Sequence, residues 1–181
     1  MGTKIRNSEA PDRGDNEEIY CILDASVMLD FIEGRIFSHL FSCPCTFITS
    51  DIIADEEINR SYTRSQLHEL GLIINELEPD ELINIMELME EHPELSPKDF
   101  SAYLFSVKYN GILASGDGAL RRFAESHQIT CHGTLWLLDH LVKRRLLTPP
   151  EGAKALGRML NGKRWLPRAE CEKRIRMWER R

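Results

Sequence analysis

Short apolar runs that alternate with helix-like segments constrain the fold of this chain more than any other feature. The first run, residues 19–25, is β-branched and apolar and ends at Asp24 with one Ala beyond it. Such a run is typical of a strand buried in a parallel sheet. Further short runs of this kind comprise residues 46–49, 71–77, 112–115 and 129–131. The alternation predicts an α/β fold, in which helices cover both faces of a central parallel sheet.

Helix signals occupy the intervals between these runs. Ser96 and Pro97 stand where a cap and a first helical residue are expected, and Gly111 ends that segment. We expect Tyr103, Leu104 and Val107 to face inward there. In the segment before it, apolar side chains share one face: Leu82, Ile85, Met86 and Met89. The predicted helices comprise residues 27–41, 51–60, 80–91, 97–110, 119–127, 133–147, 149–161 and 168–181.

No strand-like run follows Gly133, and only helices are expected beyond it. The sequence therefore predicts three parts. Residues 1–18 form a flexible polar leader, residues 19–145 form the α/β domain, and residues 146–181 form a basic helical C-terminal extension.

The net charge of −6 combines two parts of opposite sign. Residues 141–181 hold 13 Lys and Arg against 4 Asp and Glu, whereas residues 1–140 hold 10 against 25. The basic side chains can contact RNA phosphates, lie in water, or pair with the acidic part of a second copy. Trp165 and Trp178 can stack on bases or pack a helix on its core. The basic candidates are Arg144, Arg145, Lys163, Arg164, Arg168, Lys173, Arg174 and Arg176.

Several classes of protein do not fit this sequence. It has no uncharged apolar run of the roughly 18–20 residues that span a bilayer, and its N-terminus lacks the apolar part of a secretory signal. Five scattered cysteines then indicate reduced thiols in a cytoplasmic protein. Cys43 and Cys45 are separated by one residue, which is too close for the usual zinc spacing.

Two aspartates follow predicted strands directly. Asp24 ends the first strand, and Asp117 comes just after the fourth. In an open parallel sheet, ligands bind outside the carboxyl ends of the strands, where the strand order reverses. If the order is 3-2-1-4-5, the reversal lies between the first and fourth strands, and the two aspartates flank it.

Two more acids can lean into the same crevice. Asp99 lies in the first turn of the helix that leads to the fourth strand, and Glu56 lies near the start of the helix after the second. Carboxylates this close repel one another, and a hard divalent cation such as Mg²⁺ or Mn²⁺ relieves the repulsion. Glu56 shares the face of Ile52 and Ile53 on an α-helix, although Glu57 remains possible.

Each of these acids also has a purely structural explanation. Asp24 can cap the following helix, Asp117 can serve a turn, and Asp99 can form a capping box with Ser96. Glu56 can lie in water. These explanations do not account for why all four acids fall at one edge of one sheet.

The chain resembles the PIN domain, a metal-dependent nuclease fold that includes VapC-type toxins. The resemblance covers roughly residues 19–145 and rests on the order and spacing of four motifs. The motifs are ILDAS (22–26), TSDIIADEE (49–57), LSPKDFSAYLFS (95–106) and ILASGDGALRRFA (112–124).

The resemblance implies a three-layer α/β/α sandwich and RNA phosphodiester hydrolysis that depends on Mg²⁺ or Mn²⁺. It carries Asp24, Asp99, Asp117 and Glu56 over as catalytic, metal-binding acids. Ser26 and Ser115 stand where the family has small hydroxyl residues that support the pocket. Many members have a further acid shortly after the last aspartate, and this chain has none between residues 119 and 123.

The expected function is a metal-dependent endoribonuclease, and a toxin held by a small antitoxin protein is one form of it. The expected partners are RNA, an antitoxin and a second copy in a homodimer, without a membrane. The alternative is a catalytically weak PIN-like module that binds RNA or protein. A receiver-type phosphoryl domain is disfavoured, because paired acids after the first strand and a lysine after the last are missing.

Overall fold

The computed structural model describes residues 18–162 and 164–180. The described part contains a sheet of five parallel strands, with the order β3-β2-β1-β4-β5. This is the predicted order 3-2-1-4-5, which is therefore confirmed. The strands are β1 (Tyr20–Leu23), β2 (Thr46–Ser50), β3 (Ile73–Asn75), β4 (Ile112–Ala114) and β5 (Cys131–His132). The order reverses between β1 and β4, where Leu23 pairs with Ala114.

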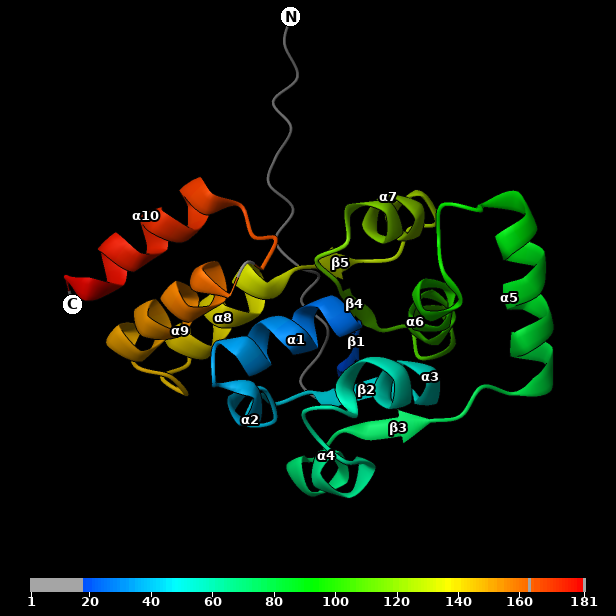
Figure 1. Ribbon diagram of the computed structural model, residues 1–181, viewed down its shortest axis with the longest axis horizontal. Coiled ribbons are helices and arrows are strands. Elements are labelled where there is room, and N and C mark those ends of the chain that lie inside the picture. The colour runs from blue at the N-terminus through cyan, green and yellow to red at the C-terminus, as the bar shows by residue number, and fades with distance from the viewer. Residues whose placement is uncertain (1–17, 163, 181) are drawn as a thin grey trace, which may run out of the picture.

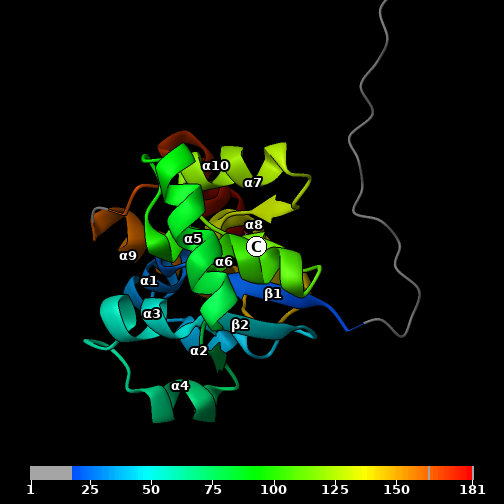
Figure 2. The same ribbon diagram turned by 90° about the vertical axis from the view of Figure 1, so that its right-hand side faces the viewer.

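Helices cover both faces of the sheet, as the alternation predicted. Figure 1 shows α1 and α9 on one side of β1, and α6 and α5 on the other; Figure 2 looks from the α5 side. The helices of the first half are α1 (Ala25–Glu33), α2 (Phe37–Leu40), α3 (Asp51–Ile53), the π-helix η1 (Ala54–Ile58) and α4 (Arg64–Leu70). Those of the second half are α5 (Pro79–Glu91), α6 (Pro97–Lys108), α7 (Gly118–Ser126), α8 (Thr134–Lys143), α9 (Pro149–Asn161) and α10 (Arg168–Glu179).

The core lies on the two faces of the sheet. The central strands β1 and β4 contribute Ile22, Leu23 and Leu113, none of which is exposed. From the helices, Phe31 of α1 and Phe105 of α6 are equally buried. The apolar runs are continuous because both faces of these strands are covered.

Several helices differ from their predicted extent. The segment predicted as one helix over 27–41 is two helices, because Arg35 takes the left-handed conformation with φ 59°. The sequence reading missed α4, which Thr63 and Gln66 begin with a capping box and Gly71 ends at φ 99°. Only Leu67 of α4 is buried, so its seven residues carry little apolar periodicity.

The predicted inward faces of α5 and α6 are partly wrong. On α5 only Ile85 is buried, whereas Met86 is 69% exposed. On α6 Val107 is exposed, and the buried face consists of Phe100, Ser101, Ala102, Phe105 and Ser106. Helix α5 packs mainly on α6 at the outside of the molecule, and no other described element covers its remaining apolar side chains.

The C-terminal helices pack on the sheet domain and on one another. Helix α9 contacts α1, α8 and α10, and Thr148 and Glu151 form the capping box predicted for its start. Trp178 of α10 is 2% exposed, so this tryptophan packs the core. The division of the chain at residue 145 stays a prediction.

Among the described residues, no helix has the length and apolar character needed to cross a membrane. All five cysteines are free thiols. The predicted leader falls almost wholly on residues 1–17, which lie outside the described residues, as does Lys163.

Candidate active site

Asp24 lies at the carboxyl end of β1 and is 5% exposed. Its backbone N–H donates to the carbonyl of Ala114 on β4, which fixes it at the reversal of the strand order. Its Oδ2 atom accepts hydrogen bonds from the hydroxyls of Ser26, at 2.5 Å, and Ser115, at 2.8 Å. The same atom caps α1 through the Ser26 N–H, so the structural role foreseen for Asp24 is real.

The two serines that support Asp24 also join β1 to the turn after β4. The hydroxyl of Ser26 accepts from the N–H of Gly116 at 2.8 Å, and that of Ser115 accepts from the N–H of Asp117 at 3.0 Å. Asp24 and Asp117 therefore share a hydrogen-bonded frame made of short hydroxyl side chains. This is the supporting position that the resemblance implied for both serines.

Burial raises the pKa of Asp24 above its usual value, because the carboxylate loses contact with water. The hydrogen bonds from Ser26 and Ser115 lower the pKa and so oppose this effect, while the negative charge of Asp99 raises it further. The sequence predicts that these two acids lie close together, and the effect of Asp99 on the pKa of Asp24 agrees with that prediction.

Asp99 lies in the first turn of α6 and is half-buried. Its Oδ2 atom accepts from the backbone N–H and the hydroxyl of Ser96, both at 2.7 Å, in the capping box that the sequence indicated. The start of α6 is also tied to the end of β2, where Ser50 and Ser101 share a buried hydrogen bond of 2.7 Å. Sequence reasoning missed this link, since buried serines give no pattern of their own.

Asp117 is exposed and caps α7. Its Oδ1 atom accepts from the N–H groups of Ala119 and Leu120, both at 2.8 Å. The turn role foreseen for this residue is thus real as well. Each of the three aspartates uses one oxygen for its own helix start, and within the described residues the other oxygen accepts no hydrogen bond.

Glu56 and Glu57 lie on η1, and both pair with Lys98 from the first turn of α6. The distance from Lys98 Nζ is 3.4 Å for Glu56, and the contact with Glu57 is shorter. The side chain of Glu56 is 62% exposed and that of Glu57 33%. An α-helix was assumed when Glu56 was preferred, and the wider π-turn of η1 changes which residues face inward. The choice between these two acids stays a prediction.

The donor set suits a hard divalent cation, because within the described residues each aspartate keeps one carboxylate oxygen without a hydrogen bond, and two hydroxyls hold Asp24 in place. The side chains do not form a closed ligand group: across residues 18–162 and 164–180, no three His, Cys, Asp or Glu side chains are placed to hold a metal ion. Bringing the free oxygens of Asp24, Asp99 and Asp117 onto one ion therefore requires rotation of their side chains.

The connection between α9 and α10 lies against this site. Arg164 donates from Nε to Oδ1 of the buried Asp30 at 2.6 Å, and from a terminal nitrogen to the carbonyl of Ser26 at 3.1 Å. A cavity of about 190 Å³ is lined there by Ser26, Asp30, Gly116, Asp117, Arg164 and Trp165. Sequence reasoning placed Arg164 and Trp165 on the extension and did not connect them with Asp117.

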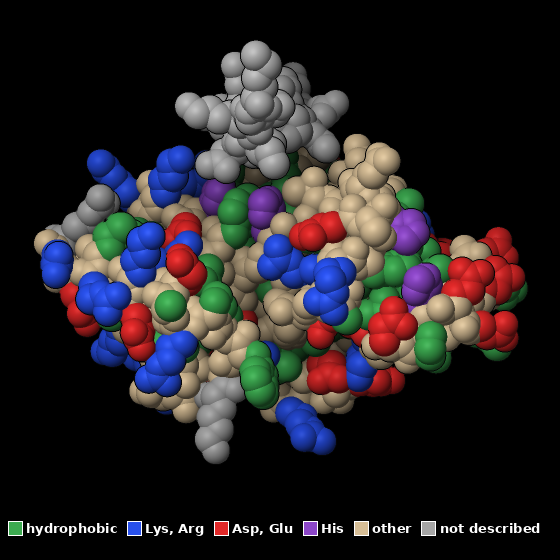
Figure 3. Space-filling view, turned by 90° about the horizontal axis from the view of Figure 1, so that it is seen from above, with side chains coloured by type: hydrophobic (Ala, Val, Ile, Leu, Met, Phe, Trp, Pro, Cys, Tyr) green, Lys and Arg blue, Asp and Glu red, His purple; other side chains and the backbone are tan. Residues whose placement is uncertain are grey.

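The other basic side chains of the extension are partly occupied by neighbouring acids. Arg174 pairs with Asp139 at 2.8 Å and Glu170 at 3.0 Å, and Arg168 and Arg176 pair with Glu172. Figure 3 shows the same division of charge as the sequence, with Lys and Arg frequent over α9 and α10 and acidic side chains gathered over α5.

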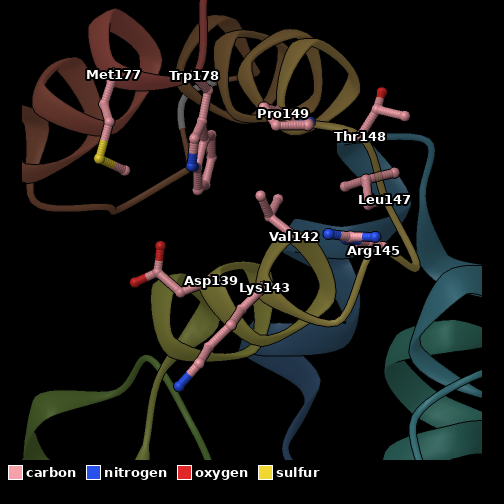
Figure 4. Close-up of a pocket in the computed structure, with 9 residues that line it drawn as sticks. All are labelled: Asp139, Val142, Lys143, Arg145, Leu147, Thr148, Pro149, Met177 and Trp178. Carbon is pink, nitrogen blue, oxygen red and sulfur yellow. The ribbon is translucent and has the colours of Figure 1, made fainter. Parts of the chain in front are cut away.

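A second cavity, of about 700 Å³, lies away from the acids between α8 and α10. Figure 4 shows Met177 and Trp178 of α10 facing Val142 of α8 across it. None of Asp24, Glu56, Asp99 or Asp117 lines this cavity, so it is not part of the candidate active site.

Comparisons with known proteins found similarities to a family model and to solved structures. The family model described as DUF3368: PIN domain matches residues 20–180. Among solved structures, the chain is similar to a PilT N-terminus domain protein, SSO1118, from the hyperthermophilic archaeon Sulfolobus solfataricus P2. The identity is 10% and the TM-score 0.45, over 67% of this chain and 92% of that one. No curated protein matches. Since the family model spans the whole sheet and all the C-terminal helices, the chain belongs to the DUF3368 family of PIN domains.

Proposed function

We propose that this protein is a metal-dependent endoribonuclease that hydrolyses RNA phosphodiester bonds at the site formed by Asp24, Asp99 and Asp117. One observation carries the proposal. Asp24 is buried where the strand order reverses, and the charge of Asp99 acts on its pKa. The hydroxyl of Ser115 bonds to both Asp24 and the N–H of Asp117. PIN domains are typically metal-dependent nucleases, and Asp24, Asp99 and Asp117 are the acids that the sequence motifs suggest for that chemistry.

The free oxygens of Asp24, Asp99 and Asp117 would hold Mg²⁺ or Mn²⁺, with Glu56 or Glu57 as an outer acid. The bound ion would lower the pKa of a water molecule and offset charge on the phosphate. Ser26 and Ser115 hold Asp24 in place by donating to its Oδ2 atom. The Oδ1 atom of the same carboxylate then has a fixed orientation and is the oxygen that would bind the ion.

Lys98 gives the same edge a fixed positive charge. Lys98 pairs with Glu56 and Glu57. Its positive charge limits the repulsion between these two acids and Asp99, the residue that follows Lys98 in the chain. Because Lys98 occupies this place and no acid follows Asp117 closely, the proposal needs only one metal ion in the site.

The cleavage test compares the full-length protein with Asp99→Asn on a labelled single-stranded RNA, in Mg²⁺, in Mn²⁺ and in EDTA. Asn keeps an acceptor for the Ser96 capping box, so the variant should fold, whereas its lost charge should reduce cleavage by about a hundredfold. The matched control is Asp80→Asn, at the start of α5 and outside the site. Equal cleavage by all three proteins would refute the role of Asp99, and cleavage in EDTA would refute the metal dependence.

A catalytically weak RNA-binding module is the second candidate, and the unclosed arrangement of the aspartates favours it. It predicts RNA binding without cleavage in either metal. The antitoxin and the homodimer are likewise proposals. Mass measurement of the purified protein, alone and after co-expression with the product of an adjacent small reading frame, tests both.

A further inference from the structure

Trp165 is almost fully in water although it lies beside the candidate active site. Its side chain belongs to the connection between α9 and α10, and the residue is 97% exposed. An exposed tryptophan alone requires no ligand, because apolar side chains on a surface are common. The position of Trp165 is what distinguishes it.

Trp165 lines two neighbouring cavities. The first, of about 190 Å³, also contains Asp117 and Ser26 of the candidate active site. The second, of about 270 Å³, lies between Trp165 and the groups of Arg121, His132 and Trp136. Gly116 lines both cavities. Trp165 therefore stands at the boundary between the acids and a groove with aromatic walls.

The backbone beside Trp165 is held in place. Arg164 is fixed to α1 through Asp30 and the carbonyl of Ser26, and its own N–H donates to the carbonyl of Met159 at 3.2 Å. The N–H of Leu166 donates to the carbonyl of Arg164 at 3.0 Å. A ring presented from an anchored segment binds a flat ligand with less loss of conformational entropy than one on a free loop.

The groove beyond Trp165 has the chemistry of a single-strand binding surface. His132 and Trp136 stack with their centroids 3.9 Å apart and their planes within 6°, and His140 continues the row at 4.1 Å from Trp136. Arg121 supplies a positive charge at the same groove. These three rings are already stacked on one another, so Trp165 is the ring that offers an open face to a base, and the guanidinium of Arg121 suits the phosphates between successive bases.

We propose that Trp165 is a stacking platform for a base of single-stranded RNA, next to the phosphate that the aspartates engage. The strand continues along the groove past Trp136, with its backbone near Arg121. A base must be unstacked from its neighbours to lie on Trp165, so a fully paired duplex is excluded from the platform. The assignment of the phosphate rests on the proposed nuclease function, whereas the stacking itself does not.

Binding in EDTA tests the platform without cleavage. Fluorescence anisotropy of a labelled single-stranded RNA decamer measures Kd for the full-length protein, Trp165→Ala and Trp165→Phe. We expect Trp165→Ala to weaken binding about tenfold or more, and Trp165→Phe to stay within about threefold because it keeps an aromatic face. A duplex of the same length should bind all three proteins equally.

Met86→Ala is the matched control, because it removes another exposed apolar side chain from α5, outside both cavities. It should bind RNA as the unchanged protein does. Thermal melting of each variant confirms that the fold is retained, which is expected for a side chain that is 97% exposed. Equal Kd values for the unchanged protein and Trp165→Ala, or no RNA binding by the unchanged protein, overturn the platform.

The platform and the nuclease fail in different ways. If Asp99→Asn abolishes cleavage while Trp165→Ala binds RNA normally, the nuclease stands and the platform does not. If binding depends on Trp165 but the protein cleaves nothing in Mg²⁺ or Mn²⁺, the platform stands and the nuclease does not.

Discussion

Ser115 donates a hydrogen bond of 2.8 Å to Asp24, a residue 91 positions earlier in the chain. The bond crosses from the end of β4 to the end of β1, where the order of the strands reverses. Both residues are buried, and Ser115 also accepts from the N–H of Asp117. One hydroxyl thus sets the positions of two of the three aspartates.

Ser115→Ala should reduce both stability and cleavage. A hydrogen bond to a buried charged group contributes about 1.5–3 kcal/mol, and we expect the free energy of unfolding at pH 7 to fall by about that amount. Urea unfolding measures it. Ser106→Ala is the control, since this buried hydroxyl donates only to the carbonyl of Ala102 within α6. An equal decrease in the free energy of unfolding of both variants would contradict the special role of Ser115.

Arg164→Met should destabilise the protein more than loss of any exposed arginine of the extension. It leaves the carboxylate of Asp30, 5% exposed, without its ion pair, at a cost of about 3 kcal/mol. Arg168→Met removes an arginine that is 82% exposed and should change stability by less than about 1 kcal/mol. If urea unfolding gives the two variants the same stability, the connection between α9 and α10 is not anchored through Asp30.

Glu57→Gln should lower cleavage more than Glu56→Gln. Glu57 is the less exposed of the two and makes the shorter contact with Lys98, in the same turn of α6 as Asp99. The RNA cleavage rates of the two variants, measured at the same Mn²⁺ concentration, show which of the two acids contributes more. A larger effect at Glu56 would contradict this expectation.

The stability of the protein should fall when the pH drops below about 6.5, in part because of His132. Burial lowers the pKa of His132 from its usual 6.5, and the positive charges of Arg121 and His140 lower it further. The folded state thus favours the neutral ring, so this contribution is present above pH 6.5 and is lost as the pH falls through the lowered pKa.

His132→Gln should weaken that dependence. The measurement is the free energy of unfolding at pH 7.5 and at pH 5.5, for the unchanged protein and the variant. His68→Gln, at an exposed position on α4, is the control and should keep the full dependence. A pH dependence that is the same in all three proteins would show that His132 does not contribute.

Local patterns in the sequence determined the α/β class, the five strands and the strand ends at which Asp24 and Asp117 lie. They did so because a strand covered on both faces needs a continuous apolar run, and a helix start needs a recognisable cap. The capping boxes of Ser96 with Asp99 and of Thr148 with Glu151 were readable for the same reason.

Only the tertiary structure decided which apolar faces are covered. The periodicity of α5 is genuine, yet Met86 is exposed because, in the part of the chain that the structure describes, no element packs outside that helix. The π-turn of η1 likewise redirected Glu56 and Glu57, since one added residue per turn rotates every side chain that follows it.

The placement of Trp165 next to Asp117 was also beyond the sequence. The two residues are far apart in the chain, and they line one cavity because Arg164 bonds to Asp30 on α1. A sequence pattern reports on neighbours within a few turns of a helix or along one strand. Contacts such as this one depend instead on how whole helices pack against the sheet, which no local pattern encodes.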